Sequence, residues 1–388
     1  MKYEVSVVIV TFNRSRLLAA ALQSVLAQDA RGVSYEVIVV DNNSNDSTSE
    51  VVREYIDRGH TNLRYLFVGT QGVSHARNAG LAAACSPVIA FADDDVTVTK
   101  DWVANIKQEF DLHPEVDFLG GKILPKWNST PPSWLTREHW WALALLDWGD
   151  KPFYVDAGYP LCLPTANASF RREVFRRLGL FSPTFSGRED HEFLLRLWRA
   201  GCRGLYVPTI VVTADVQPER LKRDYHRGWN ITTGKFNSLM RLNEIMGPDG
   251  RIVGERPGKI TLFGVPGYIY RDLLVNSLGW IGATLRGRKA ASLLCENYIW
   301  YSVGYISKRY EQHQARNQSS VAEVGSFIRS FLRKKLNQNK RESESVSDRE
   351  PEPALVTAAR IGGAHLNKIA APKQEETGEI LTNYGSVR

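Results

Sequence analysis

Cysteine is scarce in this sequence, and the few cysteines lie far apart. The 388 residues include only 4 cysteines, at Cys85, Cys162, Cys202 and Cys295. They form no Cys-x-x-Cys pair, and no histidine cluster lies near them, which argues against a zinc site and against a disulfide scaffold. We therefore expect buried, reduced thiols and a cytoplasmic protein.

Long hydrophobic runs are absent as well. No apolar stretch approaches the ~20 residues that a membrane-spanning helix needs, so any contact with a membrane is expected to be peripheral. The apolar run at residues 5–10 lacks the basic flank and the small-residue cleavage site of a secretory signal. It predicts the first strand of a buried core instead.

Acidic residues are outnumbered by basic ones. The chain has 49 Lys and Arg against 42 Asp and Glu, which gives a formal net charge of +7. Such an excess favours anionic partners such as nucleotides and phospholipid headgroups, although a solvated basic surface explains it equally well. The basic residues form no recognisable nucleic-acid-binding motif, so nucleic acid is not an expected partner.

Apolar runs rich in β-branched residues alternate with amphipathic segments near the start of the chain. The expected strands are residues 5–11, 36–40 and 87–92, and the expected helices are residues 16–28 and 47–58. This alternation is typical of right-handed βαβ units and predicts an α/β fold with a parallel sheet. Ser47, followed by Glu50, is expected to cap the second helix as a capping box.

Polar residues follow each of the three expected strands. Thr11 and Asn13 follow the first strand, Asp41 follows the second, and residues 93–95 form an Asp-Asp-Asp run after the last. Ligands of parallel α/β sheets bind at the carboxyl ends of the strands. We therefore expect the three polar clusters to converge on one rim of the sheet.

The spacing of Asp93 and Asp95 suits a hard divalent cation. Two carboxylates at a strand-to-loop bend can hold one Mg²⁺ or Mn²⁺ that also binds substrate phosphates. The alternative is an acidic turn that only closes a buried strand. Three adjacent aspartates would repel one another in such a turn unless a cation were present.

The blocks around these clusters resemble the family 2 glycosyltransferases in order and spacing. Residues 7–14, 37–46 and 91–95 carry the resemblance, and residues 72–81, 164–175 and 187–201 are similar to further segments of the family. The resemblance covers roughly residues 3–235. It implies a GT-A fold with a Rossmann-like, mostly parallel sheet flanked by helices. It also implies an inverting enzyme that moves a sugar from a nucleotide diphosphate donor to an acceptor hydroxyl, in cell-surface polysaccharide or glycolipid synthesis.

The same resemblance implies roles for individual residues. Those expected to bind the nucleotide sugar are Thr11, Asn13, Asp41, Arg77, Asp93, Asp94 and Asn167, with Ala168 beside the last. Asp95, together with Asp93, would hold a divalent cation, either Mn²⁺ or Mg²⁺. Without the family, residues 72–81 predict only a glycine-bounded helix start with Arg77 facing water.

Glu189 and Asp190 lie in the first turn of a predicted helix that ends at Gly201. Its apolar face includes Phe193 and Leu197. Carboxylates at this position complement the helix dipole, which is sufficient reason for them in many proteins. The resemblance favours a catalytic role, with Asp190 as the general base and Glu189 as its neighbour. Such a base is required because an acceptor hydroxyl is a poor nucleophile until its proton is accepted.

The sequence departs from the family pattern after the next strand. Many relatives have a histidine there that assists the diphosphate, but residues 210–215 contain none. His226 is the nearest candidate to replace it, from a mobile loop. A lone histidine is more often a packing or surface residue.

Three regions are expected along the chain. Residues 1–235 form the catalytic domain, in which residues 120–165, rich in proline and tryptophan, predict an irregular excursion over the site. Residues 236–315 form a helical, basic and aromatic appendage, and residues 316–388 a disordered tail. The appendage suits an interfacial helix on anionic lipid, although a hairpin packed on the core is equally consistent. Expected partners are therefore a glycan or lipid-linked acceptor and an anionic membrane surface, at the inner face of the plasma membrane.

Two other functions compete with this interpretation. A sugar-phosphate nucleotidyltransferase needs a glycine-rich, arginine-bearing phosphate loop after the first strand, whereas residues 11–15 read Thr-Phe-Asn-Arg-Ser. A scaffold that binds nucleotide sugars or carbohydrate without turnover is the second alternative. The presence of Asp93, Asp95 and Asp190 together argues against it.

Overall fold

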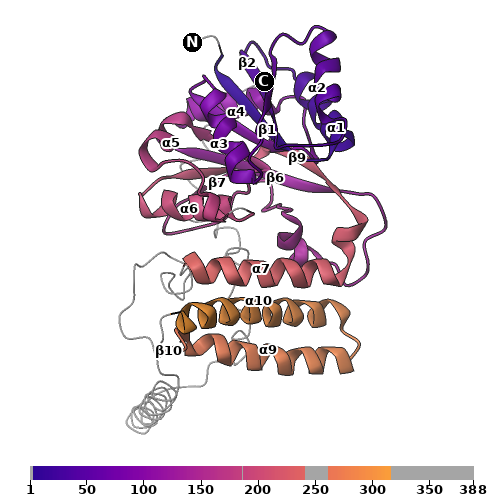
Figure 1. The fold of residues 1–388 in the computed structure, drawn as a ribbon, viewed down its shortest axis with the longest axis vertical. Helices are drawn as coiled ribbons and strands as arrows, with labels where there is room; N and C mark the ends of the chain where they lie inside the picture. The colour runs from indigo at the N-terminus through magenta and orange to yellow at the C-terminus, as the bar shows by residue number, and fades with distance from the viewer. Residues whose placement is uncertain (1–2, 186, 241–260, 316–388) are drawn as a thin grey trace. The chain divides into compact units, whose positions relative to one another are not determined.

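The computed structural model describes residues 3–185, 187–240 and 261–315 (Figure 1). The described residues divide into two compact units. Unit 1 comprises residues 3–132 and 137–221, apart from residue 186, and unit 2 comprises residues 133–136, 222–240 and 261–315. The predicted disordered tail at residues 316–388 lies outside the described residues.

A single mixed sheet forms the centre of unit 1. Its strands are β1 (Val5–Thr11), β2 (Tyr35–Asp41), β3 (Leu63–Phe67), β4 (Val88–Asp93), β5 (Val96–Val98), β6 (Phe118–Trp127), β7 (Phe153–Val155), β8 (Asn167–Arg171) and β9 (Gly204–Val216). The order is β3-β2-β1-β4-β8-β6-β9-β5, with β7 paired to β9. The strands from β3 to β4 are parallel, and β8 runs antiparallel between β4 and β6.

In unit 1, helices lie between the strands in chain order. They are α1 (Ser15–Leu26), α2 (Thr48–Asp57), α3 (Val73–Ala83), α4 (Trp102–Leu112), α5 (Arg172–Leu178) and α6 (Glu189–Arg199), with short 3₁₀ turns η1 (Arg137–Leu143), η2 (Pro183–Phe185) and η3 (Pro218–Leu221). Val7, Val8 and Ile9 of β1 are all fully buried, as expected for a central strand covered on both faces. Gly80 lets α3 approach β1 closely, because a Cβ at this position would clash with the side chain of Val8.

Several local predictions were wrong. Ser47 precedes α2, but its hydroxyl donates to Ser15 Oγ at 3.2 Å, and the Oδ1 of Asp46 accepts from the Thr48 amide at 3.1 Å. An aspartate one residue earlier therefore satisfies the end of the helix in place of the capping box. Residues 118–127 form the strand β6, so the irregular excursion begins only after it. All four cysteines are free, as expected, but Cys85 is exposed and Cys295 is only partly buried.

Unit 2 is a set of helices with a small hairpin. Its elements are α7 (Arg223–Met240), β10 (Thr261–Leu262), β11 (Val265–Pro266), α9 (Gly267–Leu285) and α10 (Lys289–Gln314). Helix α10 packs against both α7 and α9. Gly234 and Gly304 permit the close approach of α7 and α10, because a Cβ at either position would clash with backbone of the facing helix. The predicted boundary at residue 235 falls inside α7.

No helix in the described ranges combines the length and the apolar character needed to cross a membrane.

Candidate functional site

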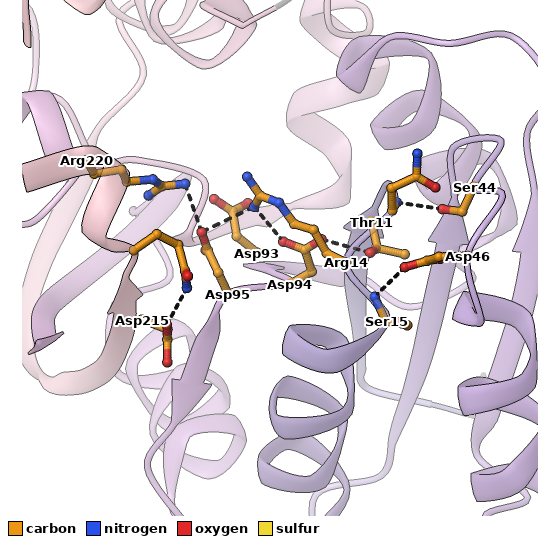
Figure 2. A network of polar contacts seen from close by, with 12 residues as sticks. Thr11, Arg14, Ser15, Ser44, Asp46, Asp93, Asp94, Asp95, Asp215 and Arg220 are labelled. Carbon is orange, nitrogen blue, oxygen red and sulfur yellow. Dashed lines mark hydrogen bonds and ion pairs between the residues drawn. The ribbon is translucent and has the colours of Figure 1, made fainter. Parts of the chain in front are cut away.

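The carboxyl ends of β1, β2 and β4 meet at one rim of the sheet. In the strand register Thr11 lies opposite Asp41, and Val10 lies opposite Asp93. The Thr11 hydroxyl donates to Asp94 Oδ2 at 2.7 Å (Figure 2). The Asn13 amide donates to Ser44 Oγ at 2.9 Å. The three polar clusters therefore converge as expected, because the parallel register fixes where each strand ends.

Two arginines lie against the Asp-Asp-Asp run. Arg14 Nη1 lies 3.1 Å from Asp94 Oδ1 and 3.3 Å from Asp95 Oδ2, and Arg220 Nη2 lies 3.0 Å from the same Asp95 oxygen. Figure 2 shows Asp95 between the two guanidinium groups. These cations offset the repulsion among the adjacent carboxylates.

Burial makes the carboxylates of this run costly to ionise. It raises the pKa of Asp94 to about 6, with the charge of Arg14 opposing the shift and that of Asp95 adding to it. Burial also raises the pKa of Asp93, where Arg77 opposes the shift and the negative charges of Asp95 and Asp190 reinforce it. Burial is thus the main cause of both shifts, and an additional cation beside the run would favour the ionised carboxylates.

Asp41 is buried at the end of β2 beside an unexpected tyrosine. Its Oδ2 accepts from the Tyr65 hydroxyl at 2.7 Å, and its Oδ1 accepts from the Ser44 amide at 2.8 Å. Burial raises the pKa of Tyr65, and the hydrogen bond to Asp41 adds to the shift, so the phenol remains a donor. Asp41 is thus held in a fixed orientation at the strand end.

Arg77 is buried on α3 and connects two parts of the site. Its Nη2 lies 3.2 Å from Asp93 Oδ1, and its Nη1 donates to Glu189 Oε1. The alternative in which Arg77 faces water is therefore wrong. The contact brings the end of β4 and the first turn of α6, which are far apart in sequence, to a single guanidinium.

The two acids of α6 have different electrostatic environments. Burial raises the pKa of Glu189, against the opposing charge of Arg77, and its Oε2 accepts from the Gly187 amide at 2.6 Å. Burial alone would raise the pKa of Asp190 too, but the charges of His191 and Arg77, with others, hold it below its ordinary value. Asp190 is therefore the more readily ionised of the two acids, while Glu189 is held by Arg77 and the Gly187 amide.

Asp93 and Asp95 could hold a divalent cation only together with ligands from the substrate. No group of three or more His, Cys, Asp or Glu side chains able to hold a metal occurs among the described residues. Mg²⁺ is commonly held by one or two carboxylates together with substrate phosphates, so two aspartates suffice if a diphosphate supplies the remaining oxygens. The side chain of Asp93 is 38% exposed and that of Asp95 is 7% exposed, which leaves Asp93 the more accessible.

The side-chain amide of Asn167 is hydrogen-bonded to other residues of the fold. Its Oδ1 accepts from Trp102 Nε1 at 2.8 Å, and its Nδ2 donates to the carbonyls of Lys122 at 2.9 Å and Ile210 at 3.0 Å. Both amide hydrogens are therefore used to join β8 to its neighbours. Ala168, the next residue, is buried in β8.

His226 does not lie on a loop, so that part of the prediction was wrong. It is fully buried on α7 in unit 2, with its ring 5.5 Å from that of Trp134 in an edge-to-face arrangement. An aromatic packing environment of this kind is the more common role of a lone histidine.

Sequence reasoning missed Tyr65, Arg14 and Arg220 as parts of the site. Arg14 had a signal, since it directly follows the first polar cluster. Tyr65 belongs to β3, which was not among the expected strands. Arg220 is separated from Asp95 by 125 residues and lies in a Pro-Glu-Arg segment that matches no motif, so only the fold reveals their contact.

The fold and the rim together define an α/β domain with an aspartate-rich ligand site at the ends of parallel strands. Residues 6–179 match the family described as glycosyl transferase family 2. The central sheet and its helices confirm the expected α/β fold class. The matched range includes Asp41, Arg77 and residues 93–95 but ends before α6, so it does not reach Asp190.

Two relatives indicate how far the similarity extends. The chain is 29% identical over 212 residues to a glucosyl-dolichyl phosphate glucuronosyltransferase of Haloferax volcanii, which is 53% of this chain and 64% of that protein. It is 36% identical over 208 residues to an uncharacterized glycosyltransferase of Nostoc sp., which is 51% of this chain and 58% of that protein. The chain therefore spans less than two thirds of either relative.

Among solved structures, a mannosyltransferase from Pyrobaculum calidifontis in complex with GDP-Man and Mn²⁺ is similar with a TM-score of 0.47 and 20% identity. The similarity covers 86% of this chain and 81% of that one.

Proposed function

We propose that this protein transfers a sugar from a nucleotide diphosphate donor to an acceptor hydroxyl. The observation that carries the proposal is the bridge made by Arg77 between Asp93 and Glu189. It joins the strand-end rim to the turn that contains Asp190, so that groups suited to the donor and a group suited to the acceptor share one site. The match of residues 6–179 to the glycosyl transferase family 2 supports the same reaction class.

The donor would lie along the rim. Asp41, held by Tyr65 and Ser44, has lone pairs available to accept a hydrogen bond from the imide N–H of a pyrimidine base. Thr11 lies opposite Asp41 in the register and would complete the base pocket. Asp93, at the partly exposed end of β4, would lie near the ribose.

The diphosphate would lie beside Asp95. Arg14 and Arg220 already contact this carboxylate, and a guanidinium that leaves it can donate two hydrogen bonds to phosphate oxygens. A divalent cation held by Asp95 and Asp93 would neutralise charge that develops on the departing diphosphate. The arginines would supply further positive charge where relatives of the family use a histidine.

Asp190 would accept the proton of the acceptor hydroxyl. Its lowered pKa keeps it ionised, and Glu189, fixed by Arg77, holds the first turn of α6 in place. The acceptor oxygen forms a bond to the anomeric carbon as the bond from that carbon to the diphosphate oxygen breaks, and the proton moves to Asp190. Attack from the face opposite the diphosphate inverts the configuration at that carbon.

The acceptor class follows from the relatives and is part of the proposal. One relative is a glucosyl-dolichyl phosphate glucuronosyltransferase, and another, 28% identical over 227 residues, is a chondroitin synthase of Escherichia coli. We therefore propose a glycan or lipid-linked acceptor in the synthesis of a cell-surface polysaccharide or glycolipid.

A panel of nucleotide sugars tests the proposal. Thermal unfolding of the full chain is followed with each donor in Mn²⁺ and in EDTA, and release of nucleoside diphosphate is measured in parallel. We expect at least one donor to raise the midpoint temperature in Mn²⁺ and to be turned over. Stabilisation by a donor without any release, with acceptors supplied, would instead favour a non-catalytic binding scaffold.

A further inference from the structure

Helix α9 of unit 2 carries a ridge of exposed apolar side chains. Leu274 is 61% exposed, Leu278 61%, Ile281 48% and Leu285 83%. They are spaced by four, three and four positions, so they lie along one face of the helix. Exposed apolar residues are common singly, but a continuous row of four is a contiguous patch that indicates an interaction surface.

The ridge is separate from the packing surface of the helix. Ile269 and Ala283 of α9 are buried, and α9 packs against α10. Leu278 and Leu285 are therefore not needed for the described contacts of the helix pair. The helix is already packed through a separate hydrophobic cluster that includes Ile269 and Tyr305, and the two leucines remain exposed beside it.

A cluster of basic residues follows the most exposed leucine. Arg286, Arg288 and Lys289, in the turn between α9 and α10, are all exposed. At the other end of the helix Arg271 is exposed too, but it is paired with Asp272 at 2.8 Å. The net positive charge of this surface is thus concentrated at the Leu285 end.

We propose that this face of α9 docks on an anionic phospholipid surface. The ridge would enter the boundary between headgroups and acyl chains, and the three basic side chains would contact lipid phosphates. The helix would lie on the bilayer, because none of the described helices is suited to span one. The net charge of +7 acts in the same direction.

Charge favours lipid over a second copy of the chain. A parallel pair of α9 helices would bring the cationic turns of both copies together. An antiparallel pair would set each cationic turn against Arg271 and Asp272, whose charges cancel, so neither arrangement provides a complementary anionic surface. Anionic headgroups provide that surface directly.

Vesicle co-sedimentation of the full chain tests the proposal. Wild-type protein should bind vesicles of phosphatidylcholine with phosphatidylglycerol at least about tenfold more strongly than vesicles of phosphatidylcholine alone, because each basic residue near the surface adds to binding. A variant carrying Leu278→Glu and Leu285→Glu should lose most of this binding. Leu112→Glu, at a residue of α4 that is 49% exposed, is the matched control and should bind as the wild type does.

Two results would overturn the proposal. One is undiminished binding by the double variant, with a circular dichroism spectrum and thermal midpoint like those of the wild type. The other is a wild-type chain that does not bind anionic vesicles and sediments as a dimer, while the double variant sediments as a monomer. That result would assign the ridge to contact with a second copy. Because no donor or acceptor is used, neither result bears on the proposed sugar transfer.

Discussion

The rim of unit 1 and the exposed face of α9 in unit 2 are built on opposite principles. At the rim, the carboxylates of Asp94 and Asp95 are buried, and Arg14, Arg77 and Arg220 contact the acidic side chains. On α9, apolar side chains such as Leu278 and Leu285 stay in water. Each arrangement is unfavourable without a partner, since buried carboxylates favour cations and exposed leucines favour an apolar medium. The comparison teaches that the two units are prepared for different ligands, and the following substitutions test the first of them.

The largest expected effect is that of Asp190→Asn. Loss of the general base should lower the rate of sugar transfer by roughly 10²- to 10⁴-fold while leaving donor affinity nearly unchanged. Single-turnover transfer and donor titration measure the two quantities separately. Asp111→Asn, at an exposed position on α4, is the control and should leave both unchanged. Normal turnover in Asp190→Asn would mean that another residue is the base.

Next in size is the effect of Asp95→Ala. The variant should lose the part of donor binding that depends on Mn²⁺, at least roughly tenfold in affinity, because the cation loses a carboxylate ligand. Thermal shifts with donor in Mn²⁺ and in EDTA give the difference. Asp150→Ala, whose side chain is 91% exposed, serves as the control. Equal Mn²⁺ dependence in Asp95→Ala and the wild type would contradict the proposed metal site.

Arg220→Ala tests whether this arginine binds the diphosphate of the donor. Removing this cation should weaken donor binding by about tenfold, because a charge-assisted hydrogen bond to the diphosphate is lost. Affinity for Mn²⁺ in the absence of donor should rise, since Asp95 is freed of one competing cation. Isothermal titration with each ligand measures both changes, and Arg199→Ala, at an exposed position of α6, is the control. Donor affinity that rises with cation affinity would mean that Arg220 only blocks Asp95.

The smallest expected effect on function is that of Asn167→Ala. It leaves the buried carbonyls of Lys122 and Ile210 without their donor, which should lower the free energy of unfolding by about 1–3 kcal/mol. Urea unfolding measures this loss. Donor affinity of the folded variant should stay within about twofold of the wild type. A large loss of affinity with unchanged stability would restore the donor contact that the family resemblance implies.

The sequence predicted the parallel half of the sheet because its signals are local. β1, β2 and β4 begin and end within one or two residues of the expected runs, and polar residues mark the ends of all three. Residues at the carboxyl ends of neighbouring parallel strands lie on one rim, so the proximity of Asp41 and Asp93 could be predicted from the sequence. The helix start at Ser47 was predicted correctly, but the capping box was not, because the Ser47 hydroxyl donates to Ser15 and Asp46 accepts from the Thr48 amide.

The other half of the sheet could not be predicted in the same way. β8 pairs with β4 and β6, and β6 pairs with β9, across long separations that leave no periodic trace in the sequence. The position of Arg220 beside Asp95 depends on that pairing, since η3 follows β9. The exposure of the α9 ridge likewise depends on which face α10 covers, and the sequence left a packed hairpin and an interfacial helix equally open.

The most direct test of the central claim is a crystal structure of the full chain with a nucleotide sugar and Mn²⁺, prepared with Asp190→Asn to prevent turnover. The account predicts a cation bound to Asp95 and to both phosphates, the base beside Asp41, and the anomeric carbon facing residue 190. A donor bound away from this rim, or bound there with its anomeric carbon directed away from α6, would contradict it.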